Sequence, residues 1–341
     1  MTLDLAWLDT VTEDILEPDR PIVDPHHHFW DRSTTPWYRS ERYLLHELLN
    51  DTNSGHNVRA TVYIECRSMW AADGPEKMRP VGETEFVNGL SAMSASGLYG
   101  DTRAAAGIVG FADLTLGAGV KPVLEAHIAA GGGRFRGIRH SASWDASDAI
   151  RNGQSSPSQH LLLEEGFREG LAQLAPLGLS FEGWFYHPTL PDFIDLARAF
   201  PDTTFIVNHC AGPLGIGPYA GHRDAIFAEW KARMSELSEC SNVNVKLGGL
   251  QMDVNGFAWH ERDRPPGSEE LAEATAPYYL HCIEEFGAER CMFESNFPVD
   301  NLSCSYHVLW NAFKRIAAGR SEAEKAALFH DTAARVYRID A

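Results

Sequence analysis

Eight short segments of the chain are rich in β-branched and other apolar residues, and a helical pattern separates most of them. These segments lie near Ile22, Ala60, Ile108, Ile138, Leu179, Thr203, Asn242 and Arg290. Most are continuously apolar rather than alternating, as is typical of parallel strands that are covered on both faces. Strand–helix alternation repeated eight times predicts an α/β fold, a distorted (β/α)₈ TIM barrel.

The segments between the strands carry helix signals. In the clearest one, LPDFIDLARAF, the residues Phe193, Leu196, Ala197 and Phe200 share one face, and Pro191 stands near the start. The 341 residues contain no internal repeat and no low-complexity linker. We therefore expect one domain over residues 1–341, in which residues 1–20 form an N-terminal arm on the barrel.

Charge and cysteine usage restrict the partners and the compartment. The formal net charge of -18 counts against nucleic acid and anionic membranes, because both require basic patches. The six cysteines are scattered without a CxxC pair, which favours reduced thiols. The acidic N-terminus is unlike a signal peptide, and no apolar run approaches the ~20 residues of a membrane span. We expect a cytoplasmic protein that acts on a small molecule, with a homo-oligomer left open.

Ionisable side chains, together with one amide, recur where the predicted strands end. Along the chain these are His26, His27, His28, Glu65, Arg139, His140, His187, His209, Glu294, Asn296 and Asp300. The carboxyl ends of all strands in a barrel surround one pocket, and active sites are built there. The sequence therefore predicts that these side chains converge on one site.

Three histidines in a row close the first predicted strand. Residues two apart in a strand face the same way, so His26 and His28 can face the pocket while His27 points away. With His187 they could offer three imidazoles to one Zn²⁺ and leave a position open for water or substrate. His209 could act as acid–base or hold a substrate oxygen. Imidazole also suits other divalent metals, and a polar strand end without metal is the alternative.

The remaining polar candidates have two interpretations each. Arg139 is either a clamp for a substrate oxyanion or a structural arginine of the barrel. Glu65 is either a substrate-binding group or an ion-pair partner of Arg139 or Arg67. Trp144 can line the pocket or belong to its rim. Lys246, in the seventh strand, is better interpreted as a structural ion-pair partner than as a nucleophile.

Several motifs resemble one known superfamily. They are IVDPHHHFWD, FYHPTLPDFIDLARAFPDTTFIVNHCAGP, VNVKLGGL, MFESNFPVD and FHDTAARVYRI, which run in order from about Ile22 to Ile339. They resemble the amidohydrolase superfamily, and within it the amidohydrolase 2 branch of sugar-lactone and dicarboxylate-lactone hydrolases and metal-dependent decarboxylases. The resemblance implies a distorted barrel with its site at the carboxyl ends of the strands.

The resemblance also implies roles for single residues. It makes His26 and His28 the strand-one metal pair, His187 the strand-five ligand and His209 the strand-six catalytic histidine. The family usually has an aspartate in strand eight, where this chain has Asn296, and an amide cannot take a proton from water. Either the metal is absent or weakly held, or the chain is a catalytically silent binder, or another group replaces the aspartate. The candidates for that group are Asp300, Glu294, Glu65 and His209.

The leading hypothesis is a hydrolase that opens a lactone, or a similar cyclic ester or amide, of a small polar substrate that can carry a carboxylate. The predicted catalytic residues are His209, Asn296, Asp300 and Arg139, the metal ligands are His26, His28 and His187, and the substrate-binding residues are Glu65, Arg139 and Trp144. Since Arg139 replaces a lysine that could be carbamylated, the resemblance implies one divalent metal at most. The rivals are a metal-dependent decarboxylase and a silent ligand binder.

Overall fold

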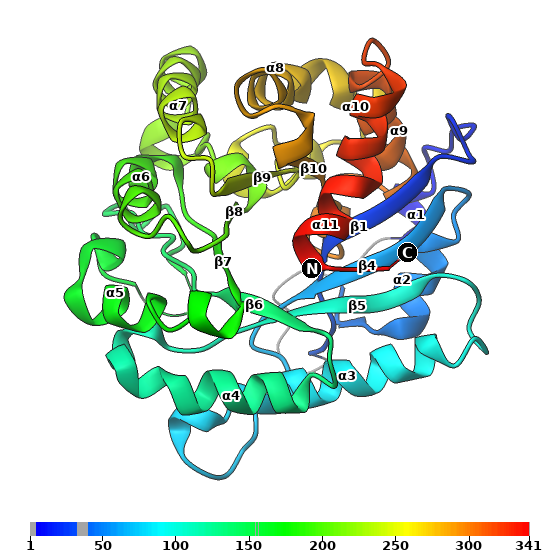
Figure 1. Ribbon diagram of the computed structural model, residues 1–341. Coiled ribbons are helices and arrows are strands. Elements are labelled where there is room, and N and C mark those ends of the chain that lie inside the picture. The colour runs from blue at the N-terminus through cyan, green and yellow to red at the C-terminus, as the bar shows by residue number, and fades with distance from the viewer. Residues whose placement is uncertain (1–4, 33–39, 154, 156, 341) are drawn as a thin grey trace.

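The barrel predicted from the sequence is present. A computed structural model describes residues 5–32, 40–153, 155 and 157–340. Eight parallel strands form one sheet in chain order (Figure 1): β1 (Pro21–His27), β4 (Asn57–Ile64), β5 (Arg103–Gly110), β6 (Phe135–Arg139), β7 (Ser180–Gly183), β8 (Phe205–Val207), β9 (Val243–Leu247) and β10 (Cys291–Phe293). Each of the eight predicted segments contributes one strand, which confirms the (β/α)₈ class.

The seam of the barrel is closed by residues that follow β10 rather than by a regular ladder. The backbone N–H of Asn296 donates to the carbonyl oxygen of His26 at 3.0 Å, and that of His28 donates to Phe297 at 2.8 Å. A parallel bridge joins His27 to Phe297. This irregular closure distorts the barrel, and it brings the strand-one histidines beside the segment that carries Asn296.

Helices surround the sheet in Figure 1. The larger ones are α2 (Leu45–Thr52), α3 (Val81–Ala95), α4 (Lys121–Ala130), α5 (Glu165–Leu171), α6 (Leu190–Ala199), α7 (Arg223–Ser238), α8 (Ser268–Phe286) and α9 (Tyr306–Ile316). Short elements complete the fold, namely α1 (Leu5–Leu8), β2 (Trp30–Asp31), β3 (Arg42–Tyr43), α10 (Glu322–Ala326) and α11 (Thr332–Tyr337). In α6 the predicted apolar face is buried at Phe193, Leu196 and Ala197, and the helix ends before Phe200.

A charged pair lies inside the barrel. Lys246 of β9 donates to the carboxylate of Glu182 of β7 at 2.7 Å, and both side chains are fully buried. Glu182 also accepts hydrogen bonds from Asn208 and from the hydroxyl of Tyr337 in α11. These partners compensate the cost of burying both charges, and the expectation that Lys246 is an ion-pair partner is confirmed.

The segment before β1 is bound to α9. The Leu16 N–H donates to Asn311 at 2.9 Å, and the Lys314 ammonium donates to the Leu16 carbonyl at 2.7 Å. All six cysteines are free thiols, as expected. Among the described residues, no helix combines the length and the apolar character that crossing a membrane requires.

Candidate active site

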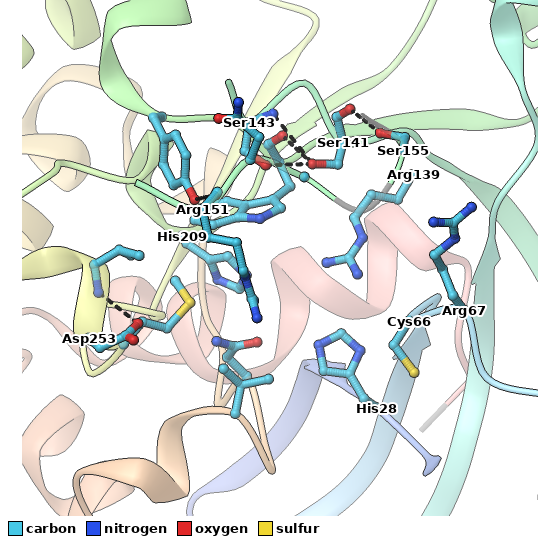
Figure 2. Close-up of a pocket in the computed structure, with 18 of the residues that line it drawn as sticks. His28, Cys66, Arg67, Arg139, Ser141, Ser143, Arg151, Ser155, His209 and Asp253 are labelled. Carbon is cyan, nitrogen blue, oxygen red and sulfur yellow. Dashed lines mark hydrogen bonds between the residues drawn. The ribbon is translucent and has the colours of Figure 1, made fainter. Parts of the chain in front are cut away.

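A cavity of about 450 Å³ lies where the strands end, and five of the predicted site residues line it. They are His28, Glu65, Arg139, His209 and Asn296. Four aromatic residues, Trp30, Phe111, Trp184 and Tyr186, form apolar parts of the wall, and Arg32, Arg67 and Arg151 add positive charge. In Figure 2 the labelled side chains of Arg139, His28 and His209 extend toward the same space. The predicted convergence on one cavity therefore holds for these five residues.

His209 is held by a glutamate that follows β10. Its Nδ1 lies 2.7 Å from Glu294 Oε1, and its backbone N–H donates to the same oxygen at 3.0 Å. Because a carboxylate oxygen accepts, Nδ1 carries the proton of the neutral ring, and Nε2 is left as a proton acceptor. Burial lowers the pKa of His209, although Glu294 opposes that shift. His209 is thus a neutral imidazole near pH 7, oriented by a carboxylate.

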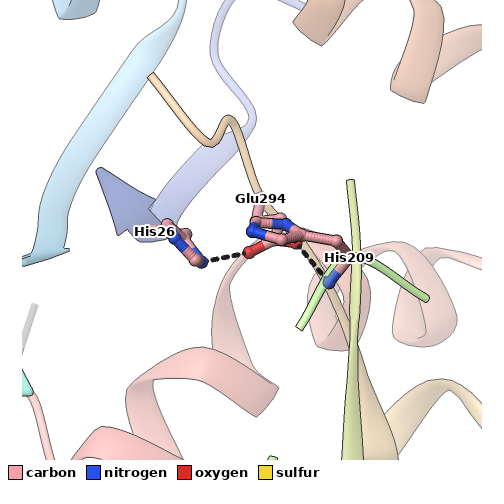
Figure 3. A group of neighbouring side chains, drawn as sticks. All are labelled: His26, His209 and Glu294. Atoms are coloured by element: carbon pink, nitrogen blue, oxygen red, sulfur yellow. Dashed lines mark hydrogen bonds and ion pairs between the residues drawn. The ribbon is translucent and has the colours of Figure 1, made fainter. Parts of the chain in front are cut away.

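The same carboxylate meets a second histidine (Figure 3). His26 Nδ1 lies 2.7 Å from Glu294 Oε2, an ion-pair distance whose angles are not those of a hydrogen bond. The rings of His26 and His209 are 4.5 Å apart. Two cations flank His26, with Arg139 Nη1 3.4 Å from Nε2 and Lys246 Nζ 3.3 Å from Nδ1. Burial, and then these cations, hold the pKa of His26 well below its usual value.

Two glycines make room for this arrangement. A Cβ on Gly249 would lie 2.3 Å from His209 Nδ1, and one on Gly248 would lie 2.4 Å from Glu294 Cγ. Gly249 also has a φ of +70°, which favours glycine. The Gly-Gly pair of VNVKLGGL therefore allows His209 and Glu294 to meet behind the cavity.

Left-handed backbone conformations concentrate at the site. His209, Cys210 and Ala211 have φ values of 54°, 50° and 59°, and Asn296 has 56°. Each such residue costs on the order of 1–2 kcal/mol relative to right-handed backbone. The indole N–H of Trp230 donates to the Cys210 carbonyl at 2.7 Å and so supports the turn. Strain of this kind is typical of functional sites.

Asn296 is oriented by Asp300. The amide Nδ2 donates to Asp300 Oδ1 at 2.8 Å, which leaves the amide oxygen as the acceptor that Asn296 can offer to the cavity. Asp300 itself is fully buried and is not among the residues that line the cavity. Burial raises its pKa well above the usual value. The structure thus places Asp300 behind Asn296 and not against a substrate.

Arg139 pairs with Glu65 and also lines the cavity. Its Nε donates to Glu65 Oε1 at 2.8 Å and its Nη2 to the Glu65 backbone carbonyl, while the side chain lines the cavity. Glu65 is the predicted ion-pair partner and also a cavity residue. An arginine fixed in this way offers its remaining N–H groups to a substrate oxygen at a defined position.

His187 and Trp144 are not brought to the cavity, whose described lining includes neither. His187 Nδ1 accepts the Leu214 N–H at 3.2 Å, and burial lowers the pKa of His187 to about 4. A neutral ring that accepts at Nδ1 carries its proton on Nε2, so neither nitrogen is free to bind a metal. The ligand role predicted for His187 stays a prediction that this geometry does not support.

The donors close enough to hold one ion are a different set. Among the described residues, one group meets this condition, His26, His209 and Glu294, with ligand atoms within 4.8 Å of one another. Two imidazoles and a carboxylate suit Zn²⁺ and related metals. Within the described chain, Glu294 Oε2 is buried without a hydrogen-bond partner, which is unusual unless a cation serves it. The residues therefore fit one divalent ion. His28, whose Nδ1 donates to the Ile64 carbonyl at 2.8 Å, stands outside this group.

Comparisons with known proteins agree with the fold. A family model described as Amidohydrolase matches residues 23–339. The chain is 33% identical over 337 residues to "Uncharacterized protein y4mH" of Sinorhizobium fredii, covering 94% of this chain and 99% of the relative. It is 25% identical over 326 residues to L-fucono-1,5-lactonase of Burkholderia multivorans, covering 93% and 96%. A crystal structure of an amidohydrolase from Burkholderia multivorans with bound zinc superposes with a TM-score of 0.71 at 24% identity, covering 94% and 99%.

The chain therefore belongs to the amidohydrolase family, and within it to amidohydrolase 2. Solved structures of this fold also include a probable 2-pyrone-4,6-dicarboxylic acid hydrolase and a 5-carboxyvanillate decarboxylase, each 12% identical to it. At that identity the likeness concerns the fold alone.

Sequence reasoning named Glu294 only as one of several replacements for the missing aspartate. One signal favoured it, because Glu294 and Asn296 are two residues apart after a strand and can face the same side. Arg32, whose Nη2 donates to the Cys66 carbonyl, carried no such signal. It follows His28 by four residues, but it stands after the predicted strand end, where the sequence does not specify the path of the chain.

Proposed function

We propose that the protein is a hydrolase that opens a lactone, or a similar cyclic ester, of a small polar substrate bound in the cavity of about 450 Å³. One observation carries the proposal: His209, which lines that cavity, contacts the carboxylate of Glu294 behind it. A neutral histidine oriented by a carboxylate is a general base that works near neutral pH. His209 can therefore take a proton from water, which the amide of Asn296 cannot do.

In the proposed reaction His209 Nε2 takes a proton from water while the water oxygen attacks the lactone carbonyl. The carboxylate of Glu294 stabilises the imidazolium that forms, as a third group does in hydrolytic triads. The proton then passes to the ring oxygen as the C–O bond breaks, which yields the open hydroxy acid. Asn296 accepts a hydrogen bond from the attacking water, and Arg139 donates to the oxygen on which negative charge develops.

A divalent ion would be held by His26, His209 and Glu294. When bound, such an ion lowers the pKa of coordinated water and polarises a carbonyl oxygen. Binding would occupy the atoms through which Glu294 orients His209, so the metal-bound and metal-free modes are alternatives. Metal analysis of the purified protein, followed by turnover with and without a chelator, separates the two modes.

Two relatives support the proposal without deciding it. The 25% identical protein is called a lactonase, and the superposed amidohydrolase structure contains zinc. Lactone carbonyls are reactive, so a general base and a hydrogen-bond donor to the developing oxyanion suffice to accelerate their opening. The Trp184 ring, whose centre lies 4.7 Å from that of the His209 ring, packs against the base and helps to hold it in place.

The test is a panel of five- and six-membered lactones assayed for acid release at constant pH. Wild-type protein should open at least one lactone, and His209→Asn should lose activity by about 100-fold or more. His160→Asn is the matched control, because His160 is 62% exposed and pairs with Asp192 outside the cavity. Release of CO₂ without ring opening would instead identify a decarboxylase, and no turnover at all would favour a ligand binder.

A further inference from the structure

A small apolar cluster, separate from the main hydrophobic core, lies at the cavity. The members of this rim cluster are Ile150, Trp184, Tyr186, Leu214, Ile216, Tyr219 and Val254. Four of them also line the cavity, namely Trp184, Tyr186, Ile216 and Val254. Satellite clusters of this kind form under loops and contribute to local structure rather than to the core of the domain. The rim cluster is therefore a candidate for a role at the site.

The rim cluster begins beside the proposed base. The centre of the Trp184 ring lies 4.7 Å from that of His209 and 5.6 Å from that of Tyr186. Trp184, Ile216 and Val254 are only half-buried. A ligand group that covers half-buried apolar side chains in a concave site is bound by the hydrophobic effect. The cluster thus offers apolar surface to whatever part of a substrate lies next to His209.

Two loops hold the rim cluster in a fixed shape. The Gly215 N–H donates to the Val254 carbonyl at 2.8 Å, and the Asn255 amide donates to the Pro213 carbonyl at 2.8 Å. A Cβ on Gly256 would lie 2.2 Å from the Gly215 carbonyl oxygen, so the two backbones pack where a side chain has no room. The loop after β8 and the loop after β9 are thereby joined. The apolar wall that they carry is preformed.

Hydroxyl groups on the cavity wall already have partners in the protein. Ser141 Oγ lies 2.7 Å from Ser143 Oγ, and Ser155 Oγ donates to the Ser141 carbonyl at 2.9 Å. The Tyr186 hydroxyl donates to the Arg151 carbonyl at 2.6 Å. Since a hydroxyl group has one proton to donate, this part of the wall offers few donors to a hydroxylated substituent.

The proposed reaction determines which part of a lactone meets the rim cluster. His209 passes its proton to the ring oxygen, so that oxygen lies at the base, while the carbonyl oxygen faces Arg139. In Figure 2 Arg139 and Asp253 lie on opposite sides of His209, and Asp253 directly precedes Val254 in the chain. The carbon bonded to the ring oxygen is therefore the ring atom nearest to the cluster.

We propose that the rim cluster is a subsite for an apolar substituent, an alkyl group on the lactone carbon that bears the ring oxygen. The lactone ring is then the polar part of the substrate, and Ile216 and Val254 are specificity-determining residues. The lactone ring rests on the function proposed above, whereas the subsite rests on the geometry of the cluster.

The first experiment compares two γ-lactones of equal size. One carries an ethyl group on the γ-carbon and the other a hydroxymethyl group, and each kcat/KM is divided by the rate constant of the same lactone with hydroxide ion. Burial of a hydroxyl group without a new partner is unfavourable, so the ethyl lactone should be favoured by about 10-fold. Equal values, or a preference for the hydroxymethyl group, would overturn the subsite.

The second experiment lengthens the γ-alkyl group from methyl to pentyl. Each CH₂ group that enters the subsite should raise kcat/KM about four-fold, until the subsite is full. Val254→Thr and Ile216→Thr each place a hydroxyl group in the apolar wall. Each variant should lower the ratio of kcat/KM for the pentyl lactone to that for the methyl lactone by at least about three-fold.

Val336→Thr is the matched control, because Val336 is half-buried in α11 and outside the described lining of the cavity. It should keep the wild-type ratio. If the ratio stays at its wild-type value in both Val254→Thr and Ile216→Thr, or changes equally in Val336→Thr, these residues do not determine the specificity.

Calorimetry with 3-alkylcyclopentanones, in which a CH₂ group replaces the ring oxygen, separates the two proposals. The subsite stands and the hydrolase fails if no lactone is opened, the pentyl ketone binds one to one and at least about 10-fold more tightly than the methyl ketone, and Val254→Thr reduces this difference. If the methyl and pentyl lactones are opened with equal kcat/KM and the two ketones bind equally, the hydrolase stands and the subsite is wrong.

Discussion

Two glutamates are buried inside the same barrel, and their surroundings differ. Glu182 accepts from a lysine, an amide and a tyrosine hydroxyl, and each of its oxygens has a partner. Glu294 contacts two histidines of lowered pKa, and its Oε2 has no hydrogen-bond partner among the described residues. A saturated carboxylate stabilises the fold, whereas an incompletely satisfied one beside a cavity is available for chemistry. We therefore expect a neutral substitution of Glu294 to lower mainly the activity, and one of Glu182 to lower mainly the stability.

Replacing Glu294 with an uncharged residue should lower kcat strongly and change the stability of the fold little. In Glu294→Gln, His209 loses the carboxylate that orients it and stabilises its charged form. We expect kcat for the best lactone to fall by about 100- to 10,000-fold, while the midpoint of thermal unfolding changes little. Steady-state kinetics with differential scanning fluorimetry measures both. Full activity of this variant would contradict the role of Glu294.

Glu182→Gln should lower the stability of the fold and leave kcat nearly unchanged. It leaves the ammonium of Lys246 buried without its counter-charge, and breaking such a pair costs about 3–5 kcal/mol. Urea unfolding should show this loss in the free energy of unfolding, while the folded fraction keeps a kcat close to that of the wild type. A stable variant with low kcat would mean that the two carboxylates do not differ as proposed.

Gly249→Ala tests whether the space around His209 matters. The added Cβ would lie 2.3 Å from the ring, so the ring must move from Glu294. We expect kcat to fall by about 10- to 100-fold, since small displacements of a catalytic group have effects of this size. Gly89→Ala in α3 is the control, because no described atom lies within 4 Å of the added methyl group, and it should keep full activity.

The pH dependence of kcat/KM should show the smallest effect. Burial lowers the pKa of His209 below its usual value of about 6.5. The base is active when neutral, so activity is complete at neutral pH and falls as the pH drops through the lowered pKa. The inflection should therefore lie below about 6.5. A profile that stays flat from neutral to acid pH would rule out His209 as the base.

The sequence predicted the framework of the site well. Each strand-end residue is placed by its strand, so Glu65, Arg139, His209 and Asn296 reach the cavity as expected. His187, which the sequence groups with His26 and His28 as a metal ligand, lies outside the lining of the cavity, and its ligand role stays a prediction. A strand end does not tell which way a ring turns after the strand. The Leu214 N–H holds that ring in place. Trp144 likewise lies in a loop whose path the sequence does not specify.

The chain by itself determined the barrel and the ring of polar groups at the strand ends, because alternation of strand and helix and the two-residue period of a strand are local properties. Only the tertiary structure decided that Glu294 meets His26 and His209. These contacts join segments far apart in the chain. They depend on left-handed turns and on space next to Gly249 that no local pattern encodes.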